Sequence, residues 1–100
     1  MKALVLDTDY AFRWENRDVP QLAPDEVLVR TRLVGVCGSD VHAVHGDQPS
    51  LVLPVVLGHE ILGDIEAVGA RAEEKRAGRA PLRVGDRVTV DPTISCGRCY

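Results

Sequence analysis

Aromatic residues are scarce in this chain. They make up 4% of its 100 residues, whereas hydrophobic residues as a whole reach 45%. A core built from this sequence must therefore be aliphatic, and valine is the most frequent residue available for it. Because β-branched side chains are stiff and pack well on a pleated surface, the composition favours a mostly β fold.

Long apolar runs and a strong excess of one charge are also absent. The longest purely apolar run, residues 51–57, contains a proline and is far shorter than the roughly 20 residues that span a bilayer. The opening MKALVLD lacks the apolar region and cleavage site of a signal peptide. The net charge is -3 and the basic residues are scattered, which excludes the basic footprint of a nucleic-acid or anionic-membrane binder. We therefore expect a cytoplasmic protein without nucleic-acid or membrane partners.

Cysteine is rare as well, with Cys37, Cys96 and Cys99 only. So few cysteines suit a reducing compartment, where they serve as metal ligands or thiols rather than in disulfides. Cys96 and Cys99 lie in SCGRCY at residues 95–100, a spacing typical of half a structural zinc site, which two thiolates alone do not close. A redox role for CGRC is the alternative, but no helix pattern follows it and no βαβ unit surrounds it.

Short strands separated by turn residues dominate the predicted secondary structure. In the longest, Val29 and Leu33 fall on one face while Arg30 and Arg32 fall on the other. Gly63 marks a bulge or a close backbone approach within a later strand. The pattern predicts a barrel or sandwich. Strands are expected at residues 2–7, 12–16, 26–36, 59–69 and 84–90.

Three other segments separate these strands. SDVHAVHG predicts one or two helical turns, with Ser39 as the N-cap and Gly46 as the stop. Residues 49–58 read as an apolar loop bounded by prolines, and residues 70–83 as a polar, charged surface loop.

The residues that carry chemistry lie in CGSDVH at 37–42 and GHE at 58–60. A thiolate and an imidazole can converge if their strands are neighbours, and zinc accepts sulfur, nitrogen and oxygen ligands. The distance in sequence from Cys37 to His59 is far longer than a zinc-finger spacing, so the tertiary fold would have to assemble the site. On these two residues alone, a buried cysteine and a hydrogen-bonded histidine without metal remain a competing interpretation.

The order of the motifs along the chain favours one family of proteins. EVLVRTRLVGVCGSDVH, LPVVLGHEILGDIEAVG, VGDRVTV and CGRC together resemble the zinc-dependent medium-chain alcohol dehydrogenase family over residues 26–100, and the opening MKALVL also fits. The resemblance implies that residues 1–100 are the N-terminal part of a GroES-like β-barrel catalytic domain with one short helix. In complete members a Rossmann domain that binds NAD or NADP follows, and no GxGxxG segment for it is visible here. We therefore expect this chain alone to be inactive.

The resemblance also implies a set of metal ligands. Cys37 and His59 would bind the catalytic zinc, and Glu60 would enter or approach the metal shell. Asp40 would accept the free ring N–H of His59 and hold its tautomer. A first-turn acid favoured by the helix dipole is the alternative for Asp40, and a salt-bridge partner is the alternative for Glu60.

Proton transfer and a second zinc complete the implied roles. Ser39 would contact the substrate hydroxyl and begin a proton relay that His42 passes to solvent, although a helix cap and a surface histidine are the alternatives. His45 has no role in the motif. Cys96 and Cys99 would be the first pair of a four-cysteine structural zinc lobe whose remainder lies beyond residue 100.

Finer assignments and competing functions stay open at this point. With glycine at position 38, between Cys37 and Ser39, the motif resembles that of polyol, threonine and many bacterial dehydrogenases. The segment AGRAPLRVGDRV followed by SCGRCY looks like the alcohol dehydrogenases associated with phosphonate catabolism. The complete enzyme would be a homodimer or homotetramer acting on a small-molecule alcohol or carbonyl substrate. The competing functions are a non-catalytic GroES-like barrel, a zinc-free reductase of the same superfamily and a small zinc- or thiol-binding protein.

Overall fold

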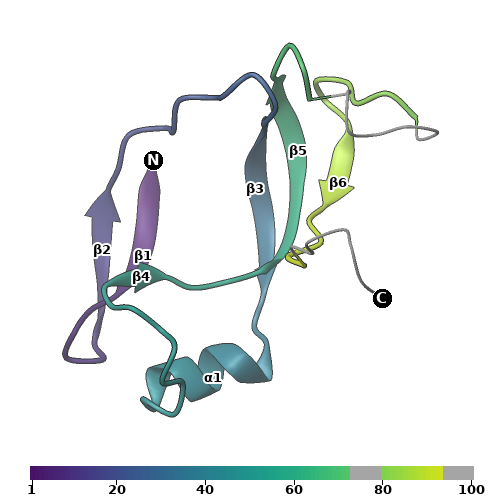
Figure 1. Ribbon diagram of the computed structural model, residues 1–100. Helices are drawn as coiled ribbons and strands as arrows, with labels where there is room; N and C mark the ends of the chain where they lie inside the picture. The colour runs from purple at the N-terminus through teal and green to yellow at the C-terminus, as the bar shows by residue number, and fades with distance from the viewer. Residues whose placement is uncertain (73–79, 94–100) are drawn as a thin grey trace.

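The computed structural model describes residues 1–72 and 80–93 (Figure 1). These residues form mostly strands with one short helix, as predicted. Part of the expected polar loop, residues 73–79, and both cysteines of CGRC lie outside the described residues. None of the described helices is long and apolar enough to cross a membrane. The elements are β1 (Lys2–Leu6), β2 (Phe12–Asn16), β3 (Val27–Gly35), α1 (Gly38–Val44), β4 (Val55–Val56), β5 (Glu60–Val68) and β6 (Arg87–Thr89).

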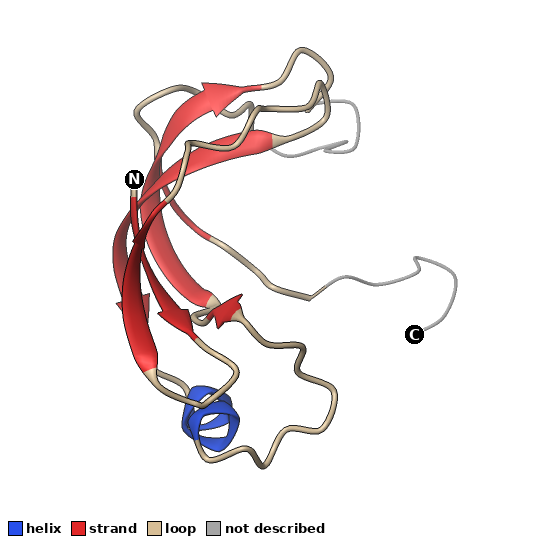
Figure 2. Ribbon diagram, turned by 90° about the vertical axis from the view of Figure 1, so that its left-hand side faces the viewer, coloured by secondary structure: helices blue, strands red, loops and turns tan. Residues whose placement is uncertain are grey.

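The strands pair antiparallel in two sheets, with the orders β2-β1-β4 and β3-β5-β6. Figure 2 shows them as a curved wall with α1 at one end. All the predicted strands are confirmed, but the interpretation of residues 49–58 as loop throughout is wrong. Val55 and Val56 form β4 and pair with Leu6 and Val5. Two residues after a proline give too short a pattern to read as a strand.

The core is small and aliphatic, as the composition predicted. Val5 and Leu6 are fully buried in β1, which has a partner strand on each side. Within residues 1–72 and 80–93, the remaining buried apolar residues come from β1, α1, β5 and the turn after β5, and they are Ala3, Ala43, Ile65 and Ala72.

β3 departs from the regular alternation that the sequence predicted. Its pairing with β5 shifts register between Leu28 and Val29 and again between Thr31 and Leu33, and the Leu33 residue is 66% exposed. At the first shift the extra residue, Glu66, lies in β5, whereas at the second the extra residue, Arg32, lies in β3. The second bulge turns the following side chains of β3 to the other face, so a period-2 pattern cannot assign the whole strand to one face. The expected close approach at Gly63 is confirmed, because a Cβ there would lie 2.7 Å from the carbonyl oxygen of Arg30.

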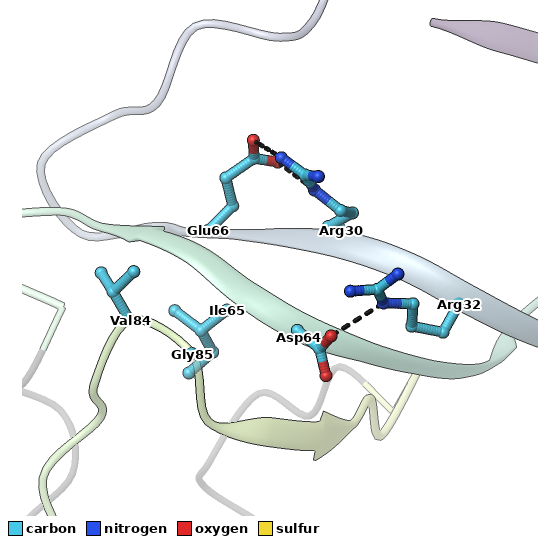
Figure 3. Close-up of a pocket in the computed structure, with 7 residues that line it drawn as sticks. All are labelled: Arg30, Arg32, Asp64, Ile65, Glu66, Val84 and Gly85. Carbon is cyan, nitrogen blue, oxygen red and sulfur yellow. Dashed lines mark hydrogen bonds and ion pairs between the residues drawn. The ribbon is translucent and has the colours of Figure 1, made fainter.

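Ion pairs cross the second sheet on the face drawn in Figure 3. Asp64 of β5 accepts a hydrogen bond from Arg32 Nε of β3 at 2.8 Å and from Arg87 Nε of β6 at 2.9 Å. Arg30 Nη2 donates to Glu66 Oε1 at 2.6 Å. All of these residues except Arg87 edge a shallow hollow of about 270 Å³. The ion pairs hold the three strands together across the sheet.

Acidification should weaken this sheet through Asp64. The hydrogen bond from Arg87, and then that from Arg32, lowers the pKa of the Asp64 carboxyl. Since its pKa in the folded chain lies below the unfolded value of about 3.9, the resulting stability is present above that value and is lost as pH falls through the folded pKa. We expect the free energy of unfolding, measured with urea at pH 7 and pH 3, to fall less in Asp64→Asn than in wild type. Asp18→Asn, in the exposed connector after β2, is the control and should behave like wild type. An equal fall in Asp64→Asn and wild type would contradict the contribution of Asp64 to the loss of stability in acid.

Candidate metal centre

The ends of two paired strands bring distant residues together at one end of the second sheet. β3 ends at Gly35, β5 begins at Glu60, and these two residues are partners in the antiparallel register. Cys37 comes two residues after the end of β3, and His59 directly precedes β5. The pairing of β3 with β5 therefore brings Cys37 and His59 close together, although they are far apart in the sequence.

Cys37, His59 and Glu60 form a tight cluster. Each residue offers one potential ligand atom, and the three atoms lie within 4.8 Å of one another. They are the Cys37 Sγ, a ring nitrogen of His59 and a carboxylate oxygen of Glu60. Cys37 and His59 are half-buried, while Glu60 is exposed. A thiolate, an imidazole and a carboxylate are the ligand types of zinc sites, and three protein ligands leave a position open for substrate. The donor set therefore fits a zinc ion.

Gly35 leaves room for the Glu60 side chain. A Cβ at position 35 would lie 3.0 Å from Glu60 Cβ and would collide with the Glu60 carboxylate. Any other residue at position 35 would therefore displace this carboxylate from Cys37 and His59. The sequence alone does not predict this role of Gly35, because a glycine that ends a strand gives no signal of what lies across from it.

α1 begins earlier than predicted. Its N-cap is Cys37, with φ −87° and ψ 159°, so the prediction of Ser39 as the N-cap is wrong. The carboxylate of Asp40 explains the shift, because its Oδ2 accepts the backbone N–H of Cys37 at 2.9 Å, the reciprocal half of a capping box. Gly46, with φ +79°, lies just past the C-cap His45, as the predicted stop requires.

The same carboxylate faces the histidine of the cluster. Asp40 is the one polar residue among the described residues that is buried, with 9% of its surface exposed. Its Oδ1 lies 3.7 Å from His59 Nδ1, while its Oδ2 holds the backbone of Cys37. One side chain thus links the helix start to both half-buried members of the cluster.

The surroundings of Cys37 favour its thiolate. Hydrogen bonds from the backbone N–H of Ser39, from its hydroxyl and from His59 lower the pKa of the Cys37 thiol. Burial of the thiol, and then the negative charge of Glu60, oppose this lowering. The thiolate is the form that binds metal ions, so the site has less proton competition to overcome.

The two predicted relay residues lie on one helix. Ser39 is half-buried and donates its hydroxyl toward Cys37, at the cluster. His42 lies three residues further on, where its side chain is 69% exposed and its Nδ1 is 3.9 Å from Asp47 Oδ2. Residues three apart are neighbours on a helix, so Ser39 and His42 lie on a line from the cluster to solvent. His45, at the end of the helix, is exposed.

The chain is similar to a known domain family, and to proteins of known sequence and structure, over most of its length. The family described as "Alcohol dehydrogenase GroES-like domain" matches residues 23–100. The sorbitol dehydrogenase of Bacillus subtilis is 40% identical over 102 residues, which cover 99% of this chain and 27% of that protein. The solved alcohol dehydrogenase TADH from Thermus sp. ATN1 is 40% identical, with a TM-score of 0.77, over 99% of this chain and 27% of that one.

A second solved structure is a putative zinc-binding dehydrogenase from Sinorhizobium meliloti 1021 bound to NADP. It is 39% identical, with a TM-score of 0.78, over 98% of this chain and 26% of that one. The chain spans about a quarter of the length of these relatives, 26–27%.

Proposed function

The chain belongs to the alcohol dehydrogenase GroES-like domain family, and from this premise we propose that it is the N-terminal part of the catalytic domain of a zinc-dependent oxidoreductase. The enzyme would transfer hydride between a small-molecule alcohol and NAD or NADP. The single observation that carries the proposal is the convergence of Cys37, His59 and Glu60. The relatives, which include a sorbitol dehydrogenase and a zinc-binding dehydrogenase bound to NADP, support an alcohol or polyol substrate and a nicotinamide cofactor.

The competing functions do not account for this cluster. A non-catalytic barrel or a zinc-free reductase has no use for a thiol of lowered pKa next to an imidazole and a carboxylate. A small thiol-binding protein built on CGRC would not need His59, nor the carboxylate of Asp40 facing it. The cluster therefore favours the dehydrogenase.

The family resemblance supplies a role for each of these residues, and the geometry of the cluster supports it. Cys37, His59 and Glu60 would hold the zinc ion, which when bound would supply a Lewis acid that lowers the pKa of an alcohol hydroxyl. Ser39 would turn its hydroxyl from Cys37 to the substrate and relay the proton without holding charge. His42 would release the proton to solvent, since an imidazole ring can both accept and donate a proton and this one is exposed. The hydride would leave for NAD or NADP.

Several finer features remain predictions of the same proposal. They are a homodimeric or homotetrameric enzyme, a cytoplasmic location, a structural zinc lobe that begins with Cys96 and Cys99, and membership of the subgroup associated with phosphonate catabolism.

The contact of Asp40 with the cluster gives a test of the proposed site. Asp40→Asn keeps an oxygen that can accept the Cys37 N–H but removes the charge that faces His59. We expect zinc affinity to fall roughly 10- to 100-fold, the usual cost of losing a partner that orients a metal ligand. The measurement is a competition titration with a chromophoric chelator in a background with Cys96→Ser and Cys99→Ser. The control is Asp47→Asn, the same change on an exposed carboxylate next to His42, and unchanged affinity in Asp40→Asn would count against the role of Asp40.

A further inference from the structure

An aromatic residue in an unusual backbone conformation occupies the turn between β1 and β2. Tyr10 has φ +61°, and it is the one non-glycine residue with positive φ in the described part of the chain. The turn itself is well bonded, because Asp7 N–H donates to Ala11 O and Tyr10 N–H donates to Asp7 O, each at 2.9 Å. Bulky residues rarely adopt this conformation and persist in it only when the surroundings hold them. A glycine or asparagine would suit the turn better, so the ring of Tyr10 needs an explanation.

The ring of Tyr10 packs against the end of α1. A Cβ built on Gly46 would lie 3.2 Å from Tyr10 Cζ, 3.3 Å from its hydroxyl oxygen and 3.4 Å from Cε1. Gly46 itself has φ +79° and lies just past the helix. Both views show the β1–β2 turn next to α1 (Figures 1 and 2). The two positive-φ residues therefore meet, and the absence of a side chain at position 46 lets the ring come close.

α1 depends on such contacts. It has 7 residues, too few for a helix to persist on its own in water. It buries only Ala43 and Asp40. Asp40 ties its first turn to Cys37 and faces His59. The ring of Tyr10 covers its other end.

We propose that Tyr10 is a positioning residue that clamps the C-terminal end of α1 against the β1–β2 turn and thereby holds Cys37 and Asp40 in place opposite His59. The inference rests on the proposed function insofar as the cluster is a zinc site. It deepens that function by assigning a contribution to the first hairpin, which supplies no ligand. The strained conformation of Tyr10 is then the cost of aiming its ring at Gly46.

The test separates the ring from the turn. Tyr10→Asn keeps a residue that tolerates positive φ but removes the ring, and Tyr10→Phe keeps the ring. Phe12→Asn, on the same hairpin, is the matched control, because Tyr10 and Phe12 are similarly exposed, at 46% and 49%. All variants are made in the full chain with Cys96→Ser and Cys99→Ser. Two quantities are measured. The first is zinc affinity, and the second is the hydrogen-exchange rate of the Gly46 and Asp47 amides, which donate hydrogen bonds to Ala43 O and His42 O at the end of α1.

We expect Tyr10→Asn to weaken zinc binding about tenfold and to speed exchange of both amides by a similar factor. Tyr10→Phe should stay within about twofold of wild type in both, and so should Phe12→Asn. Unchanged amide exchange in Tyr10→Asn would overturn the clamp. Faster exchange with unchanged zinc affinity would overturn the positioning role, as would equal losses in Phe12→Asn. Failure of the proposed function can be told apart from failure of the clamp. If the proposed function is wrong, wild type and His59→Ala bind zinc equally, whatever the Tyr10 variants do.

Discussion

Replacing His59 with alanine should abolish zinc-dependent turnover in the complete enzyme that we propose, while leaving the strands folded. The half-buried imidazole is one of three potential ligands within 4.8 Å of one another, and its removal leaves a thiolate and an exposed carboxylate. The loss should exceed the roughly 10- to 100-fold that removal of an orienting partner costs, because a direct metal–ligand bond disappears. The measurement is steady-state alcohol oxidation with NAD and NADP, with bound zinc measured on the same samples.

The chain provides a matched control for this change. His45 is an exposed histidine at the end of α1, and His45→Ala should leave turnover and zinc content within about twofold of wild type. Retained activity in His59→Ala would eliminate the metal site proposed here. Equal losses in the two variants would show that the effect arises from the fold rather than from the ligand.

The second large effect concerns stability. Leu6 is fully buried in β1 between β2 and β4, so Leu6→Ala removes methyl groups from the most enclosed part of the core. Such truncations cost about 2–5 kcal/mol, because the lost transfer free energy is added to the cost of the cavity. We expect the free energy of unfolding of the full chain, from urea denaturation, to fall by about 3 kcal/mol.

Leu4 lies on the same strand but is 39% exposed, so Leu4→Ala should cost well under half as much as Leu6→Ala. Similar losses at the two positions would mean that the two-sheet arrangement around β1 does not describe the folded chain.

The strands were predictable because their signals are local. Short runs with Val, Ile or Thr, punctuated by Gly and Pro, indicated β1, β3, β5 and β6 within a few residues, and the aromatic residues of FRWEN indicated β2. What failed depends on contacts between segments. Pairing with Val5 and Leu6 makes β4 a strand. The bulge between Thr31 and Leu33 changes the face to which Leu33 points, and Leu33 is exposed. No periodicity in a single segment reports either effect.

The site shows the same division. The ligand types in CGSDVH and GHE were visible in the sequence, and the family resemblance supplied the roles that we propose for them. The sequence could not reveal that the Cys37 backbone is held by Asp40, which moved the helix start away from Ser39. Nor could it reveal the space above Gly35, or the ring of Tyr10 over Gly46, because each depends on a partner far away in the chain.

The central claim is that Cys37 and His59 bind zinc together. X-ray absorption at the zinc edge of the zinc-loaded full chain tests it most directly, in a background with Cys96→Ser and Cys99→Ser so that Cys37 is the one remaining thiol. We predict a single sulfur at about 2.3 Å with nitrogen and oxygen ligands at about 2.0–2.2 Å. In Cys37→Ala the sulfur contribution should disappear. A zinc ion with no sulfur ligand in the Cys37-containing chain would contradict the account.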